Sequence, residues 1–175
     1  MSLSLQILPL LLSSIAGYTD WRSRRIPNWL TIPGLLVGVL LNTLVRGWPG
    51  TKDSLLGAGL GLALLLPFVI IRALGAGDWK LVGALGAFLG PRPLMLVLVV
   101  TILVNGVMAF VMIVWKKRVR QTARNFAQML AAVASFRLPG RELTLDNPDA
   151  VKVPFGVAVA IAMILYTVSR IWVRG

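Results

Sequence analysis

The sequence contains no cysteine and no histidine, and these two absences remove most of the common catalytic and metal-binding arrangements. Disulfide bonds, Cys–His nucleophilic pairs, Ser–His–Asp triads, haem ligation through these residues and the usual zinc sites are all excluded. Acidic residues are also scarce, with 6 Asp and Glu among 175 residues. Any catalysis must therefore depend on carboxylates, hydroxyls, lysine or a bound cofactor.

Charged residues as a whole are few. They make up 14% of the chain, against about 25% in an average soluble domain, while 57% of the residues are hydrophobic and the mean hydropathy is +0.82. This composition is typical of a membrane protein. Lys and Arg outnumber the acids by 18 to 6 and lie mostly between apolar runs. We therefore interpret the basic excess as contact with anionic membrane lipids, not with nucleic acid.

Six apolar segments match or approach the roughly 17–25 residues that cross a bilayer. We predict membrane helices at 3–18, 29–45, 54–74, 79–89, 94–115 and 154–172. The fourth segment is short, but it must span if the basic loops are to share one side of the membrane. The predicted fold class is an all-α integral membrane protein with six transmembrane helices, forming a single membrane-embedded domain over 1–175.

The distribution of basic residues predicts the orientation of these helices. Thirteen of the 18 Lys and Arg lie in the loops after the first, third and fifth segments. That side is predicted to be cytoplasmic, with both chain ends outside. The polar segment 116–153 also has apolar residues at helical spacing, namely Val119, Ala123, Phe126, Leu130 and Val133. It predicts a basic amphipathic cytoplasmic helix, lying either on anionic lipid or against the bundle itself.

Two aspartates lie at the same predicted membrane boundary, because Asp20 follows the first segment and Asp78 precedes the fourth. Each has a purely structural interpretation. Asp78 can cap the helix that follows it, with Gly75 and Gly77 allowing the tight turn before it. Asp20 can form an ion pair with Arg24, one helical turn later.

Together the two carboxylates are candidates for a catalytic pair. Ionisable residues near membrane depth usually face a polar cavity and are functional candidates. Two carboxylates close together cannot both ionise easily, so one keeps a proton. The ionised member can then activate a water, while the other protonates an amide leaving group. Glycines beside Asp78 would also let a peptide backbone approach closely.

Three stretches resemble the motifs of the type IV prepilin peptidase family. Residues 20–28 (DWRSRRIPN) resemble its first motif, and residues 75–80 (GAGDWK) resemble the GxGD signature of membrane aspartyl proteases. Residues 153–158 (VPFGVA) are similar to the family's apolar PYG segment, with Phe in place of Tyr. The three stretches occur in the family's order along the chain.

The resemblance implies that Asp20 and Asp78 are the catalytic pair, with no metal and no cofactor. It implies endoproteolysis of a prepilin-like substrate at the cytoplasmic face of the bacterial inner membrane, just before the substrate's apolar helix. Pilus or secretion machinery would be a further partner. The other matching motif residues, with supporting roles, are Gly75, Gly77, Lys80, Arg22, Arg25, Pro27, Asn28, Pro154 and Gly156.

Some of these supporting residues have expected roles of their own. Pro27 and Asn28 are expected to shape the start of the second span, because proline bars an ordinary helix through this point. Lys80 would lower the pKa of the neighbouring carboxyl, meet an acidic residue of the substrate, or extend to the lipid headgroups. Arg22 and Arg25 are interpreted mainly as determinants of membrane topology.

Longer family members carry an N-terminal cytoplasmic segment with cysteine pairs and also N-methylate the new terminus. This chain begins close to its first span and lacks cysteine, so it resembles the short, peptidase-only form associated with tight-adherence (Flp-type) pili. One alternative is a related peptidase acting on pseudopilins or preflagellins. Others are a non-enzymatic membrane subunit of a pilus or secretion assembly, and a small transporter using the aspartates as proton sites. The last fits less well, because the fifth and sixth segments contain no further acidic residue.

Overall fold

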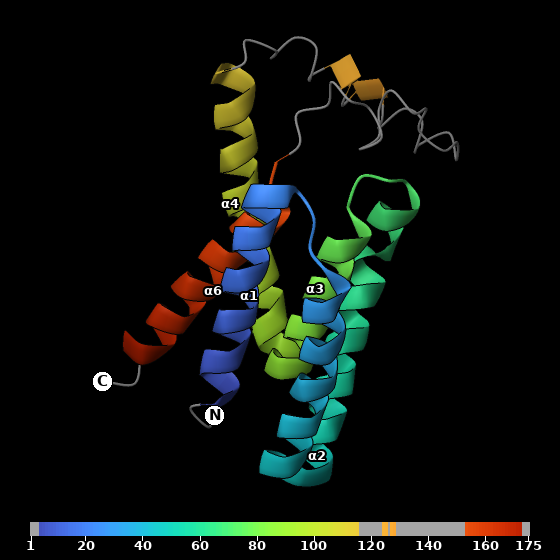
Figure 1. Cartoon of the computed structure of the whole chain (residues 1–175), viewed down its shortest axis with the longest axis vertical. Coiled ribbons are helices and arrows are strands. Elements are labelled where there is room, and N and C mark those ends of the chain that lie inside the picture. The colour runs from blue at the N-terminus through green and yellow to red at the C-terminus, as the bar shows by residue number, and fades with distance from the viewer. Residues whose placement is uncertain (1–3, 116–123, 126, 129–152, 173–175) are drawn as a thin grey trace.

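The fold is a bundle of α-helices (Figure 1). The structure is a computed structural model that describes residues 4–115, 124–125, 127–128 and 153–172. Its helices are α1 (Ser4–Ser23), α2 (Asn28–Ile70), α3 (Ala76–Leu89), α4 (Pro91–Trp115) and α6 (Phe155–Trp172). No strand occurs within the described ranges, which confirms the all-α prediction.

The long helix α2 consists of two arms that meet at Gly47. This residue has a φ of 63° and a ψ of −149°, which glycine adopts without strain. Figure 1 shows the first arm running toward one end of the bundle and the second arm returning beside it. The two arms correspond to the predicted segments 29–45 and 54–74, which the structure joins through a tight turn.

Helix α3 forms the centre of the bundle. It packs most extensively against the two arms of α2 and also contacts α1, α4 and α6. All residues from 81 to 90 are buried, and Leu81 and Leu85 are among the largest side chains that are fully enclosed. With 14 residues, α3 is about 21 Å long, shorter than the roughly 30 Å hydrocarbon core of a bilayer. The predicted short fourth segment is therefore a helix enclosed by the others.

The three motif stretches gather at one end of the bundle. Figure 1 shows the end of α1, the turn before α3 and the start of α6 at the same end, while α1 begins and α6 ends at the other. Helices α1 and α6 also pack closely along each other. This arrangement brings 20–28, 75–80 and 153–158 together, although they are far apart in the sequence.

In the part of the chain that the structure describes, three helices are long and apolar enough to cross a membrane. They are α2, α4 and α6, with mean hydropathies of 1.9, 2.8 and 1.7 in their most apolar windows. Large apolar side chains on α4, such as Leu103 and Phe110, are exposed, as lipid-facing side chains would be. Six spans stay a prediction. The amphipathic helix predicted within 116–153 lies outside the described residues, apart from 124, 125, 127 and 128, which are helical.

Candidate active site

Asp20 is held in place by the N-terminus of another helix. It lies in the last turn of α1 and is 7% exposed. Its Oδ2 atom accepts a hydrogen bond of 2.8 Å from the backbone N–H of Gly156, the second residue of α6. The first N–H groups of a helix lack partners within the helix and carry partial positive charge. The start of α6 therefore stabilises the ionised form of Asp20.

This contact depends on the absence of a side chain at residue 156. A Cβ atom added to Gly156 would lie 2.9 Å from the Cβ of Asp20 and 3.1 Å from its Oδ2. Pro154, two residues before Gly156, is buried, and its carbonyl accepts the N–H of Ala158 as α6 begins. Pro154 and Gly156, both named from the sequence, thus shape the helix start that holds Asp20.

Asp78 does not cap α3, so the capping interpretation of this residue is wrong. The helix begins at Ala76, and its N-cap residue is Gly75, which has an extended backbone. Asp78 is the third helical residue, and a backbone hydrogen bond links its carboxyl to Gly75. An acidic side chain at this position commonly reaches back to the N-cap N–H. The carboxyl is half-buried and lies so near Gly75 that a Cβ there would be 2.9 Å from Oδ2.

The second glycine of the GxGD stretch receives part of the chain's own backbone. A Cβ on Gly77 would lie 3.0 Å from the carbonyl oxygen of Ile26 and 3.1 Å from its Cβ. Ile26 is buried in the loop between α1 and α2. Ile26 therefore fills the space that was predicted for a peptide backbone beside Gly77. It packs the end of the first motif against the start of α3.

A hydrogen bond also joins the first two motifs. The Nζ of Lys80 donates to the Oδ1 of Asn28 at 3.0 Å. Asn28 is the first residue of α2, and Pro27 is the N-cap before it, so both lie at the start of the second predicted segment. Arg22 donates to the hydroxyl of Tyr18 at 3.2 Å, and both arginines of the motif named above, Arg22 and Arg25, are exposed.

The two aspartates influence each other electrostatically. Both lie outside the three candidate spans. Burial raises the pKa of Asp20, against the smaller lowering effects of the Gly156 hydrogen bond and the Arg24 charge. Burial and then the Asp20 charge raise the pKa of Asp78 to about 7, against the Gly75 hydrogen bond. Near neutral pH Asp78 therefore keeps its proton more readily than an ordinary aspartate, and the nearby Asp20 charge contributes to this.

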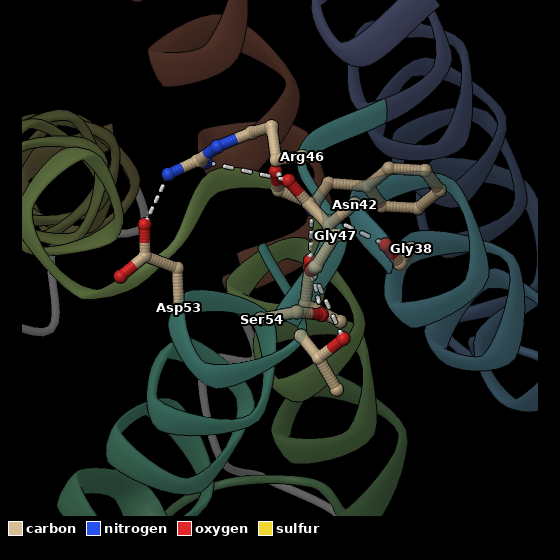
Figure 2. A network of polar contacts seen from close by, with 9 residues as sticks. Gly38, Asn42, Arg46, Gly47, Asp53 and Ser54 are labelled. Carbon is tan, nitrogen blue, oxygen red and sulfur yellow. Dashed lines mark hydrogen bonds and ion pairs between the residues drawn. The ribbon is translucent and has the colours of Figure 1, made fainter. Parts of the chain in front are cut away.

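Sequence reasoning missed the residues that hold the other end of α3 (Figure 2). The Nδ2 of Asn42 donates to the carbonyls of Ala87 at 2.8 Å and Phe88 at 3.1 Å, and the Oγ of Ser54 donates to Ala87 at 2.6 Å. These carbonyls belong to the last turn of α3, where no helical N–H is available. The sequence signal was weak: a buried amide and a buried hydroxyl at the ends of two apolar segments.

A third overlooked contact lies beside Asp78. The indole N–H of Trp79 donates to the carbonyl of Leu62 at 2.7 Å, across to the second arm of α2. Within the part of the chain that the structure describes, α3 is thus hydrogen-bonded to both arms of α2. Its own side chains donate near its start, and the side chains of Asn42 and Ser54 donate to its carbonyls near its end. The position of Asp78 is consequently determined by contacts along the whole helix.

The chain belongs to the Type IV leader peptidase family, whose sequence model matches residues 7–110. The matched region includes the first two motif stretches, whereas 153–158 lies beyond it. No solved structure matches the chain.

Several bacterial proteins named prepilin leader peptidase/N-methyltransferase are similar to this chain. The one from Xanthomonas campestris pv. campestris is 30% identical over 119 residues, which cover 64% of this chain and 41% of that protein. The one from Aeromonas hydrophila is 32% identical over 121 residues, covering 65% and 41%. The one from Neisseria gonorrhoeae is 33% identical over 108 residues, covering 58% and 37%. The matches thus span about two fifths of these relatives.

Proposed function

We propose that this chain is a membrane aspartic endopeptidase that removes the leader peptide from type IV prepilin-like precursors, with Asp20 and Asp78 as its catalytic pair. The observation that carries the proposal is the gathering of the three motif stretches at one end of the bundle (Figure 1), where Asp20 accepts the Gly156 N–H and Asp78 lies at the start of α3. The charge of Asp20 also helps raise the pKa of Asp78 to about 7. Both residues lie in the region that matches the family, and the relatives are named as prepilin leader peptidases.

The contacts of the two acids support a different role for each. Asp20 accepts the Gly156 N–H, which favours its ionised form, so Asp20 serves as the base. Asp78 keeps its proton below about pH 7 and serves as the acid. As a water adds to the scissile carbonyl carbon, Asp20 takes its proton. The C–N bond then breaks as the amide nitrogen receives a proton from Asp78, which leaves a new carboxyl and a new amine.

The proposed membrane arrangement has six spans: the part of α1 before Asp20, the two arms of α2, the part of α3 after Asp78, α4 and α6. The aspartate pair faces the cytoplasm at the inner membrane, and both termini lie outside. This orientation is supported by the basic residues near the motif end, including Arg22, Arg25, Arg72 and Lys80. The alternating direction of successive helices in Figure 1 is consistent with it.

The first substrate to test is a Flp-type prepilin, because the sequence resembles the short form of the family. Pseudopilins and preflagellins are the substrates of the nearest alternative. We do not extend the methyltransferase part of the relatives' name to this chain, and propose cleavage alone. The mass of the new N-terminus, with or without a methyl group, tests this point directly.

The test is co-expression of the full chain with a tagged Flp-type prepilin, followed by measurement of the mass of the tagged protein. Wild type should remove the leader. Asp20→Asn and Asp78→Asn should each reduce cleavage by about 100-fold or more, because each removes a proton-transfer group. Asp53→Asn is the matched control, since Asp53 is an exposed acid near the other end of α3. It should cleave like wild type.

Two outcomes would count against the proposal. Continued processing by either Asn variant at equal expression would show that the pair is not catalytic. Absence of processing by wild type, with pilus assembly that requires the chain and tolerates both Asn variants, would favour the non-enzymatic subunit. Processing of a pseudopilin or preflagellin in place of the Flp-type precursor would keep the mechanism and change the substrate.

A further inference from the structure

A cleft lies between α4 and α6, beside the start of α4 and the end of α6. Its volume is about 560 Å³, and both charged and apolar side chains line it. On α4, Arg92, Leu96 and Val100 follow one another at steps of four residues, which places them on one face of the helix. On α6, Leu165 and Arg170 line the opposite wall. The cleft is therefore basic at the helix ends and apolar further along.

The two arginines are available to a ligand. Among the described residues, neither Arg92 nor Arg170 has a hydrogen bond or an ion pair, and both side chains are exposed. A guanidinium group presents parallel N–H donors that match the oxygens of a phosphate. Two guanidinium groups that line one cleft are therefore suited to an anion.

The position of the cleft along the helices indicates its depth. Arg92 is the second residue of α4, and Arg170 is the third from the end of α6. Both helices are candidate membrane spans, so these arginines lie at the ends of apolar segments, where charged heads reach the lipid headgroups. Leu96, Val100 and Leu165 lie further into the spans, at the depth of the hydrocarbon chains.

We propose that this cleft binds an anionic phospholipid, with its phosphate between Arg92 and Arg170 and an acyl chain along Leu96, Val100 and Leu165. Charge complementarity between the two arginines and the phosphate accounts for the head. The apolar walls account for the chain, which a free phosphate would leave unused. Since the motif stretches lie at the opposite end of these helices, this lipid would join α4 to α6 far from the aspartate pair (Figure 1).

The test is native mass spectrometry of the purified full chain with equal amounts of phosphatidylglycerol and phosphatidylcholine that carry the same acyl chains. Wild type should retain mainly phosphatidylglycerol. Combined Arg92→Gln and Arg170→Gln should reduce this retention about tenfold or more. The control Lys52→Gln removes an exposed cation outside the cleft and should leave retention unchanged.

Three results would overturn the proposal. Equal retention of the two lipids would show that the arginines do not select the headgroup. An equal loss with Lys52→Gln would show attraction to general surface charge. Displacement of phosphatidylglycerol by an equal concentration of inorganic phosphate would show an ion site and no lipid site. Thermal unfolding should be similar for all these variants, because the arginines have no hydrogen bond or ion pair to lose within the described ranges.

A second variant tests the acyl chain separately. Leu165→Trp fills the apolar wall and leaves both arginines intact, so phosphatidylglycerol retention should fall. Leu165 is 52% exposed, and a larger apolar side chain there can extend into the cleft without crowding the core. Unchanged retention in this variant would contradict the proposed path of the acyl chain.

Discussion

The two ends of α3 differ in how their polar groups are satisfied. At the C-terminal end, the carbonyls of Ala87 and Phe88 accept hydrogen bonds from Asn42 and Ser54, and all four residues are buried (Figure 2). At the N-terminal end, the Asp78 carboxyl is half-buried beside another acid, and its pKa is raised to about 7. We call the C-terminal end of α3 the closed end, because its carbonyls are buried and hydrogen-bonded. At the N-terminal end, burial and the charge of Asp20 oppose the ionisation of the Asp78 carboxyl.

This difference shows how a short helix can hold an unfavourable carboxyl in a defined place. The closed end allows very near approach, since a Cβ on Gly86 would lie 2.3 Å from the carbonyl oxygen of Gly57. Such close packing and satisfied carbonyls stabilise α3 against α2. This stabilisation offsets the unfavourable burial of the Asp78 carboxyl at the other end. Such a conflict between activity and stability is common at functional sites.

The largest expected effect is that of pH on cleavage. The working pair needs one ionised and one protonated carboxyl. As pH rises above about 7, Asp78 loses its proton, and the rate should fall about tenfold per unit, or about 100-fold over two units. At acid pH the rate should fall again when Asp20, whose pKa is also raised, becomes protonated. Initial rates across pH with a purified prepilin measure both limbs.

Stability should follow pH in a related way. The unfolded chain loses the Asp78 proton near the ordinary value of 3.8, whereas the folded chain keeps it to about 7. Between these values the folded state binds more protons, so this group lowers the free energy of unfolding as pH rises. Asp78→Asn should therefore be at least as stable as wild type at pH 8. In the cleavage measurement, an initial rate that stays constant from pH 6 to 9 would contradict the pairing of Asp20 with Asp78.

The next effect concerns the closed end. Asn42→Ala leaves the carbonyls of Ala87 and Phe88 with fewer partners in a buried site, and should lower the free energy of unfolding by about 1–3 kcal/mol. Denaturant or thermal unfolding in detergent measures this loss. Cleavage at a temperature well below unfolding should stay near wild type, because nine residues of helix, about 14 Å, separate Ala87 from Asp78.

A pair of serine variants sharpens this comparison. Ser54 donates to Ala87 from a buried position, whereas Ser14 donates to Leu10 within its own exposed helix face. Ser54→Ala should therefore destabilise the protein by about 1 kcal/mol or more, and Ser14→Ala by less than about 0.5 kcal/mol. Equal losses would mean that the buried hydrogen bond from Ser54 stabilises the protein no more than the exposed hydrogen bond from Ser14.

Near the N-terminal end of α3, the variant Gly156→Ala tests how α6 holds the Asp20 carboxyl. The added Cβ would lie 2.9 Å from the Cβ of Asp20, so the carboxyl must shift by several tenths of an ångström. Cleavage should fall about tenfold, since small displacements of reacting groups are costly. Gly38→Ala is the control. It crowds a helix contact almost as closely, with the Cβ of Ala87 at 3.0 Å, at the other end of α3. A similar loss in both variants would indicate general disruption.

The sequence predicted the helices well and their mutual contacts only in part. Apolar runs marked every helix from α1 to α6 described above, because lipid-facing and buried residues are both apolar. This shared apolar character also meant that the sequence could not show the enclosed position of α3, because 79–89 has the composition of a short membrane span. The helix starts three residues earlier than the capping interpretation of Asp78 requires, because Gly75 and not Asp78 has the extended backbone of an N-cap.

Contacts between distant segments were beyond the reach of sequence patterns. The bond from Gly156 to Asp20 crosses 136 residues, and only the resemblance suggested that both stretches serve one site. Asn42 and Ser54 bond to backbone carbonyls, which leave no mark in the side-chain sequence. Residues 20, 78 and 156 were named in advance, whereas those that anchor α3 needed the structure.

The smallest expected effect is that of the ion pair beside the closed end. Arg46 pairs with Asp53 across the Gly47 turn and also approaches the Oδ1 of Asn42 at 3.5 Å (Figure 2). Both charged side chains are more than a third exposed, so solvent screens the pair, and its coupling energy should be only about 0.2–1 kcal/mol. A double-mutant cycle with Arg46→Gln and Asp53→Asn measures that coupling in unfolding experiments. Cleavage should be unchanged in all three variants, because the pair is remote from Asp78. A coupling energy well above 1 kcal/mol would mean that this ion pair stabilises the end of α3 as much as the buried hydrogen bonds of Asn42 and Ser54 do.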